Sequence, residues 1–175
     1  MKKYIYASAI TLLVSVIAVL ASVPPIPVAV GAVSRHIAPD YLYPDPKLTP
    51  GKIATSDFKE LTSTVNGLTY SKNHRVTPQS MKNQVCKEYP VNCKGNPRPE
   101  VDHFVPLALG GADDALNLWE EPDTIMWNGQ DWGYHTKDKL EAYMIIQMKK
   151  GKIAPKDAQN CIMNDWVSCY KQYIK

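Results

Sequence analysis

The sequence predicts a single α+β domain in which a bent hairpin is flanked by helices. Residues 101–119 read V-D-H-F-V-P-L-A-L-G-G-A-D-D-A-L-N-L-W, with extended segments on either side of a Gly-Gly turn. Apolar side chains then recur at helical spacing after Thr136, and another helical pattern covers residues 155–173. The chain has 175 residues and no internal repeat, which leaves room for one compact domain of ordinary size.

The first helix of the domain is predicted at Thr77. Thr77 would be the N-cap and Pro78 the first helical residue, and the helix would run to about Tyr89, before Pro90. Residues 24–56 lie upstream, are rich in proline and show little periodicity, which predicts an extended spacer.

Residues 102–118 are predicted to form a hairpin or an Ω-like loop. Gly110 and Gly111 offer the positive φ of a tight turn, and Pro106 can bend the strand end. The two ends of such a loop meet, so we expect Asn117 near His103 although they are fourteen residues apart. An asparagine amide both donates and accepts hydrogen bonds, and Asn117 is therefore predicted to hold the loop closed.

A helix that starts at Thr136, its N-cap, is predicted to follow the hairpin. Its apolar face consists of Leu140, Tyr143, Met144 and Met148. The C-terminal helix is expected to pack across the hairpin and this helix through Ile162, Trp166 and Tyr170. His135 lies just before the predicted start of the helix.

Three of these side chains predict metal-assisted hydrolysis. Asp102 and His135 come from different elements, and a carboxylate and an imidazole can hold a divalent cation whose remaining ligands are water and substrate oxygens. His103 is then left as a base. An imidazole has an ordinary pKa of about 6.5, so it can take a proton from water near neutral pH.

The motif resembles that of the HNH nucleases, in the branch whose signature runs D-H-x-x-P-L-x-L-G-G-x-x-x-x-x-N-L-W. The resemblance covers roughly residues 45–175. It extends to Leu48-Thr49-Pro50-Gly51, Arg75-Val76-Thr77, residues 82–89, Lys137-Asp138-Lys139-Leu140-Glu141, Ala158-Gln159 and Asp165-Trp166.

By this resemblance the domain would contain a ββα-metal core, and the protein would be an endonuclease that hydrolyses phosphodiester bonds. Asp102 and His135 would bind one divalent cation, with Mg²⁺ favoured over Mn²⁺, Zn²⁺ or Ni²⁺. His103 would be the general base, and Asn117 would complete the catalytic set by orienting the hairpin. DNA is the expected substrate and RNA the alternative. The chain has no base-reading motif, so little sequence preference is expected.

The chain departs from the wider superfamily in two respects. It lacks the paired cysteines that bind a structural zinc around the motif in many members, and its last histidine lies farther from the asparagine. Residues 120–134 form a longer insertion rich in aromatic and acidic side chains. The four tryptophans, Trp119, Trp127, Trp132 and Trp166, are expected to pack in the core or loops instead of stacking on bases.

The N-terminal residues 1–33 read as a signal peptide or a membrane anchor. Lys2 and Lys3 precede an uncharged stretch, and the prolines that follow its most apolar part, residues 7–23, resemble the end of a signal peptide. The expected division is therefore this segment, a spacer over residues 34–56, and the nuclease domain over residues 57–175. Both interpretations predict an exported protein, either secreted or periplasmic, or anchored in a membrane.

The four cysteines, Cys86, Cys93, Cys161 and Cys169, predict two disulfides in an oxidising compartment. Their spacings match no common structural zinc site. On one unbroken helix over residues 155–173, Cys161 and Cys169 would be about 12 Å apart, too far for a disulfide. This favours bonds from the Cys86 and Cys93 region to the C-terminal helix, unless that helix breaks near Asn164.

The charge balance does not by itself indicate a nucleic-acid-binding protein. The formal net charge is +3, and without Lys2 and Lys3 it falls to +1. Binding must then depend on local basic clusters, in which Arg75, Lys137 and Lys139 are the predicted phosphate contacts. The alternative function is a non-catalytic exported scaffold, braced by disulfides, that binds nucleic acid or a partner protein.

Overall fold

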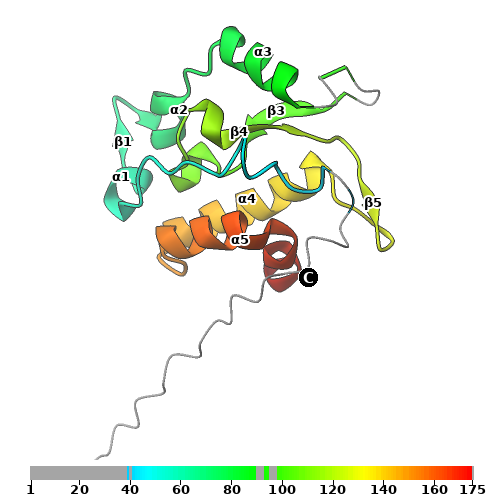
Figure 1. Ribbon diagram of the computed structural model, residues 1–175. Coiled ribbons are helices and arrows are strands. Elements are labelled where there is room, and N and C mark those ends of the chain that lie inside the picture. The colour runs from blue at the N-terminus through cyan, green and yellow to red at the C-terminus, as the bar shows by residue number, and fades with distance from the viewer. Residues whose placement is uncertain (1–38, 40, 90–92, 95–97, 175) are drawn as a thin grey trace, which may run out of the picture. The chain divides into compact units, whose positions relative to one another are not determined.

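The computed structural model describes residues 39, 41–89, 93–94 and 98–174. These residues belong to one compact unit, assigned to Ala32–Lys175. They form helices and small antiparallel sheets, so the predicted α+β class is confirmed (Figure 1). The described α-helices are α1 (Phe58–Thr62), α2 (Tyr70–His74), α3 (Gln79–Glu88), α4 (Tyr134–Lys149) and α5 (Pro155–Tyr173).

The described strands pair into three two-stranded antiparallel sheets. The pairs are β1 (Thr64–Val65) with β2 (Leu68–Thr69), β3 (Glu100–His103) with β4 (Leu118–Glu121), and β5 (Met126–Trp127) with β6 (Gln130–Asp131). Asn66-Gly67 and Asn128-Gly129 turn the two shorter hairpins, and all four residues have positive φ. An Asn-Gly pair suits this two-residue turn because both residues tolerate that conformation.

The predicted hairpin in the motif is formed by β3 and β4. Asp102 pairs with Trp119 and His103 with Leu118, so the two ends of the connecting loop are neighbours. The loop contains two short 3-10 helices, η2 (Leu107–Leu109) and η3 (Ala115–Asn117). After β4 and the β5–β6 hairpin the chain enters α4.

Two helices begin at residues other than the predicted ones. Helix α3 has Pro78 as its N-cap and Gln79 as its first residue, one position later than expected. Helix α4 has Gly133 as its N-cap and begins at Tyr134, so Thr136 is not the cap. The Thr136 hydroxyl instead donates a hydrogen bond to the Asp131 carbonyl, 2.8 Å away.

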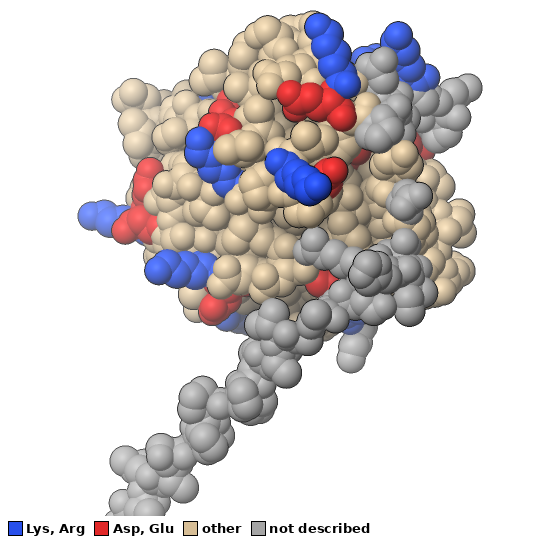
Figure 2. Space-filling model, viewed as in Figure 1, with Lys and Arg blue, Asp and Glu red and all other residues tan. Residues whose placement is uncertain are grey.

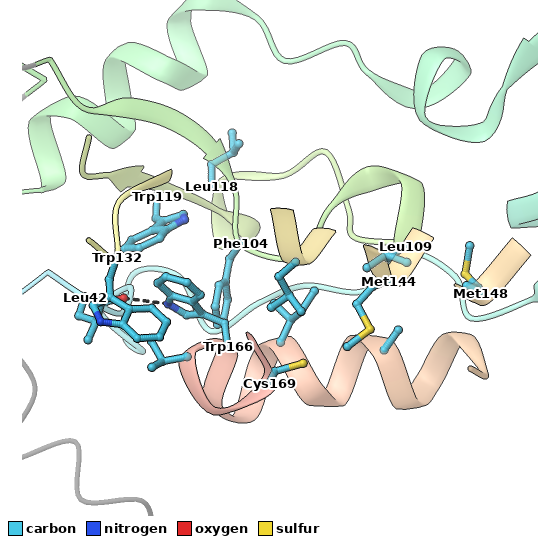
Figure 3. Packing of buried hydrophobic residues seen from close by; sticks show 14 of the residues in the cluster. Leu42, Phe104, Leu109, Leu118, Trp119, Trp132, Met144, Met148, Trp166 and Cys169 are labelled. Carbon is cyan, nitrogen blue, oxygen red and sulfur yellow. Dashed lines mark hydrogen bonds between the residues drawn. The ribbon is translucent and has the colours of Figure 1, made fainter. Parts of the chain in front are cut away.

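The core lies between the hairpin and the two C-terminal helices. Leu140, Met144 and Met148 line the inner face of α4, as predicted, whereas Tyr143 is only partly buried. Figure 3 shows Trp119, Trp132 and Trp166 in the same cluster as Phe104. Trp119, Trp132 and Trp166 are each at most 2% exposed, and Trp127 packs against this cluster, which agrees with a packing role for all four tryptophans.

Helix α5 is broken in the middle, and the break decides the disulfide pairing. Asp165 has non-helical backbone angles, φ −165° and ψ 91°. This brings the Cα atoms of Cys161 and Cys169 to 5.5 Å, and the two form a disulfide. The other disulfide joins Cys86 and Cys93. The favoured bonds between the Cys86 region and the C-terminal helix were therefore wrong, and a helix break next to Asn164 is what the structure contains.

The second half of the predicted spacer packs onto the domain. Leu42 is fully buried, and its carbonyl accepts a hydrogen bond from the Trp166 indole at 2.9 Å. The Thr49 hydroxyl donates to the Leu118 carbonyl at 2.6 Å. Ile53 forms a β-bridge with Gly111. Residues 41–56 thus contact the domain along much of their length.

The signal peptide or membrane anchor predicted at residues 1–33 lies outside the described residues. In the part of the chain that the structure describes, no helix is both long enough and apolar enough to span a membrane.

Candidate active site

Asn117 fastens the two ends of the motif loop. Its side chain is fully buried and accepts a hydrogen bond from the Val105 N–H at 2.9 Å. The same amide donates to the carbonyls of Val105 and Ala112, both at 2.9 Å. The backbone N–H of Phe104 also donates to the Asn117 carbonyl at 2.7 Å. These bonds agree with the role predicted for Asn117, which holds the loop closed.

Gly111 lets the loop pack this closely. A Cβ atom on Gly111 would lie 1.9 Å from the Val105 carbonyl oxygen and 2.7 Å from the Asn117 amide nitrogen. Neighbouring Gly110 has a φ of +90°, which L side chains rarely adopt. The Gly-Gly pair thus serves both the turn and the close backbone approach beside His103.

The His103 ring lies between two aspartates. Its Nε2 atom is 2.8 Å from Asp113 Oδ1, and its Nδ1 atom is 3.5 Å from Asp102 Oδ1. The residue is 2% exposed, and Nδ1 is a buried atom without a hydrogen-bond partner. Because an ionised carboxylate only accepts hydrogen bonds, Nε2 must carry the proton. In the neutral ring, Nδ1 then has the free lone pair.

Asp113 is held in place from the other side by the segment before α3. Its carboxylate accepts hydrogen bonds from the N–H groups of Val76, at 2.5 Å, and Thr77, at 2.6 Å, and from the Thr77 hydroxyl at 2.5 Å. Burial alone would raise the pKa of Asp113, but the bonds from Thr77 and His103 lower it to about 2. Asp113 is therefore ionised at neutral pH.

Asp102 is also ionised and remains accessible. Burial alone would raise the pKa of its carboxyl, but the protonated form of the His103 ring, the charge of Lys137 and the His103 backbone lower it to about 2. The Asp102 side chain keeps 23% of its surface exposed, and Arg75 Nη1 lies 4.0 Å from its Oδ1 atom. A carboxylate with this charge and access can bind a cation.

His135 lies in the first turn of α4 instead of before the helix, and it is exposed. Its ring packs against Tyr134 with the centroids 4.0 Å apart. Burial, followed by the charge of Asp102, raises the pKa of Glu100, and His135 opposes this rise. Burial likewise raises the pKa of Asp138, and His135 again opposes the rise. These four side chains therefore share one electrostatic neighbourhood. Among the described residues, however, no three histidine, cysteine or acidic side chains converge as a ready-made metal site.

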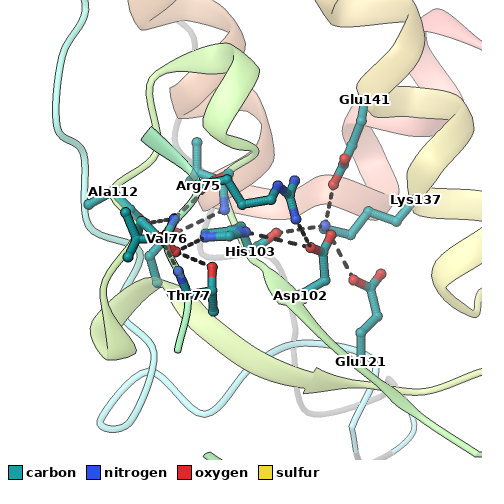
Figure 4. A network of polar contacts seen from close by, with 12 residues as sticks. Arg75, Val76, Thr77, Asp102, His103, Ala112, Glu121, Lys137 and Glu141 are labelled. Carbon is teal, nitrogen blue, oxygen red and sulfur yellow. Dashed lines mark hydrogen bonds and ion pairs between the residues drawn. The ribbon is translucent and has the colours of Figure 1, made fainter. Parts of the chain in front are cut away.

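Lys137, predicted as a phosphate contact, lies in the interior. It is 1% exposed, and its ammonium donates to the His103 carbonyl at 3.1 Å, to Glu121 at 3.4 Å and to Glu141 (Figure 4). Burial alone would lower the pKa of Lys137, but Glu121 and Glu141 raise it. Because its charge faces these two carboxylates, we no longer assign Lys137 to phosphate binding.

Lys137 instead anchors α4 to the strand end that carries His103. Burial raises the pKa of Glu121 to about 8 and that of Glu141 to about 7, against the effect of Lys137. One ammonium faces two carboxylates, so the cluster favours one protonated acid. The other two predicted phosphate contacts are exposed, Arg75 beside Asp102 and Lys139 on α4.

The sequence interpretation missed Asp113 and the Glu121–Lys137–Glu141 cluster. Glu141 had a signal, because a lysine and a glutamate four residues apart on a helix are neighbours. Asp113 had none, since its partners Val76 and Thr77 lie more than thirty residues away in sequence.

We compared the chain with models of protein families, with curated proteins and with solved structures, and found no match.

Proposed function

We propose that this protein is a metal-dependent endonuclease of the HNH type, which hydrolyses phosphodiester bonds in DNA with little sequence preference. The observation that carries the proposal is the setting of His103. Its Nε2 atom is bonded to Asp113, while Nδ1 has no hydrogen-bond partner and lies next to Asp102. This arrangement of an oriented base beside an ionised carboxylate is what water activation requires.

The order of elements supports the same assignment. A β3–β4 hairpin with Asp102 and His103 at one strand end is closed by Asn117, and the chain later enters α4 with His135 in its first turn. This order corresponds to a ββα-metal core with an inserted β5–β6 hairpin. We propose that the fold is of that kind.

In the proposed reaction, His103 Nδ1 takes a proton from the attacking water. Asp113 keeps the other ring nitrogen protonated and stabilises the imidazolium that forms. Nδ1 is out of contact with solvent, so the water must reach it past Asp102, whose side chain is partly exposed. Arg75 and Lys139 contact the phosphates on either side.

The donors for a divalent cation would be the Asp102 carboxylate and the His135 imidazole. They fit a hard or borderline cation such as Mg²⁺, with water and phosphate oxygens as the other ligands. A cation bound there would polarise the scissile phosphate and stabilise the leaving oxygen. With only two donors from the protein, the cation should bind weakly in the absence of substrate.

The two disulfides suit an oxidising compartment, which agrees with a protein that acts outside the cytosol. We propose that it is exported. Figure 2 shows basic and acidic side chains interspersed over the face that it draws, so attraction of DNA must depend on the immediate surroundings of the site.

Plasmid cleavage by the purified, oxidised protein with Mg²⁺, Mn²⁺, Zn²⁺ or EDTA tests the proposal. His103→Ala should lower the rate about 10²- to 10⁴-fold, as expected for loss of a general base. His74→Ala is the matched control, because its ring contacts Tyr70 and no candidate site residue. Free imidazole should partly restore His103→Ala, since the deleted ring leaves a space beside Asp113.

Two results would contradict the nuclease. One is a His103→Ala protein that cleaves as fast as the wild type. The other is absence of cleavage with any of the cations, which would favour the disulfide-braced binding scaffold. That scaffold needs no cation, so titration of Mn²⁺ into wild type and Asp102→Ala separates the two functions independently of turnover.

A further inference from the structure

A polar groove runs between α3 and β3, next to the candidate active site. It has a volume of about 300 Å³. From α3 it is lined by Gln79, Lys82, Asn83 and Cys86, and on the other side by Cys93 and Arg98 to Val101. The residues from α3 are spaced at i, i+3, i+4 and i+7, so they form one continuous face of that helix.

The lining of the groove ends at Val101, one residue before Asp102. Glu100 and Asp102 alternate along β3, which places their side chains on the same face, and Arg98 lies two residues before the strand. Four residues of strand span about 13 Å, and one strand of a duplex rises 3.4 Å per nucleotide. The distance from Asp102 to Arg98 therefore corresponds to about four nucleotides measured along the axis of a duplex.

The basic side chains of the groove are available to a ligand. Lys82 is half-buried and Arg98 is exposed, and neither forms an ion pair within 4.0 Å among the described residues. Lys82 and Glu100 both line the groove. Glu100 is the one acid among the lining residues, so the charge of the lining is positive.

The two walls of the groove are cross-linked. The Cys86–Cys93 disulfide joins the α3 wall to the segment before β3. The N–H group of Cys93 donates to the Glu120 carboxylate, which connects that segment to β4. A preformed groove loses little conformational entropy when it binds an extended ligand.

We propose that this groove binds the nucleic-acid strand that flanks the scissile bond, with Lys82 and Arg98 as contacts to its phosphates. The proposal rests on the proposed nuclease function and names the path of its substrate. The contacts are to the phosphodiester backbone, which agrees with cleavage of little sequence preference.

The test compares the double variant Lys82→Gln/Arg98→Gln with Lys149→Gln/Lys152→Gln. The control removes two exposed basic groups at the far end of α4 and in the turn that follows it. Both variants and the wild type are assayed on a 30-nucleotide DNA duplex and on bis(4-nitrophenyl) phosphate. The second substrate has one phosphodiester and no flanking nucleotides, so it cannot occupy the groove.

We expect the double variant to have a raised KM and an unchanged kcat on the duplex, because flanking contacts bind substrate and transition state equally. All three proteins should cleave the small ester at the same rate. Binding to a fluorescent duplex is measured in EDTA at several salt concentrations. The slope of log affinity against log salt concentration should become shallower by about 1.8 for the double variant only, because it has lost two phosphate contacts.

If the double variant and the wild type have equal kinetics on the duplex, the groove does not bind the flanking strand, whereas the proposed nuclease function is unaffected. Failure of every protein to cleave either substrate would instead overturn the proposed function. In that case the binding measurement still decides the groove, because an unchanged salt slope in the double variant would exclude Lys82 and Arg98 as phosphate contacts.

Discussion

The orientation of one ring, that of His103, depends on which of two adjacent aspartates faces it. Asp113 and Asp114 are equivalent as residue types, but only Asp113 reaches the imidazole, whereas Asp114 caps η3 and pairs with Lys52. The sequence motif indicated a base at His103 and a closing amide at Asn117. It did not indicate the acid, because the choice depends on the path of the loop and on its contact with Thr77.

Asp113→Asn should impair catalysis through the tautomer of His103. The carboxylate accepts from four donors, and an amide replaces one of its two acceptors with a donor. If the amide oxygen keeps the two backbone bonds, its NH₂ group faces Nε2, which must then accept. The proton moves to Nδ1 and the base is lost, so kcat should fall about 10²- to 10⁴-fold.

The measurement is kcat on plasmid or duplex DNA, together with the melting temperature of each variant. Asp114→Asn is the control, since it changes the same charge one residue away. A melting temperature that falls equally in both variants, without loss of kcat in Asp113→Asn, would exclude an orienting role for Asp113.

At the scale of elements, local patterns predicted what local forces determine. The hairpin over residues 102–118 and the inner face of α4 are correct, because a Gly-Gly turn and a helical apolar period act within a few residues. The two Asn-Gly hairpins were missed although their signal is present in the sequence. The packing of residues 41–56 could not be predicted, since it depends on distant partners such as Trp166.

The break in α5 is stabilised by Asp165, and this can be tested. Asp165 accepts hydrogen bonds from the Ser168 N–H at 3.0 Å and from the Tyr43 hydroxyl at 2.7 Å. It is therefore the N-cap of the second half of α5 and also holds the N-terminal segment. Asp165→Ala should lower the free energy of unfolding by about 2 kcal/mol, because it removes the cap and the acceptor of the Tyr43 hydroxyl bond.

Denaturation by urea under oxidising conditions measures this loss. Asp157→Ala is the comparison, because Asp157 is an exposed acid in the first turn of the same helix, and it should cost only about 0.5 kcal/mol. Equal losses in the two variants would show that Asp165 contributes only its charge.

For the molecule as a whole, the sequence indicated net charge but not which charges are buried. Lys137 was predicted at the surface, yet it lies between Glu121 and Glu141. Residue type alone could not reveal this, because lysine and glutamate are rarely buried. The buried cluster and the aspartates around His103 together determine how stability depends on pH.

Stability should change with pH in two ranges and in opposite directions. The pKa values of Glu121 and Glu141, about 8 and 7, lie above their usual value of 4.5. The folded protein therefore binds more protons than the unfolded chain, and stability should fall as the pH rises from about 5 to about 8. Asp102 and Asp113, with pKa values of about 2, make stability fall as the pH drops below about 4.

Thermal unfolding at pH 3, 5, 6.5 and 8 should thus give the highest melting temperature near pH 5. Glu121→Gln removes one of the two buried acids. It should reduce the fall in melting temperature between pH 5 and 8 without changing the fall below pH 5. A wild-type melting temperature that increases steadily from pH 5 to 8 would show that the cluster is not buried in solution.

The disulfides join cysteines that are consecutive along the chain, Cys86 with Cys93 and Cys161 with Cys169. Four cysteines allow three connectivities, and this is the one in which each cysteine pairs with the next to emerge. In the export that we propose, the amino end would enter the oxidising compartment first, and the first bond could close before the second pair of thiols arrives. Oxidation in that order would give the pairing that the structure contains.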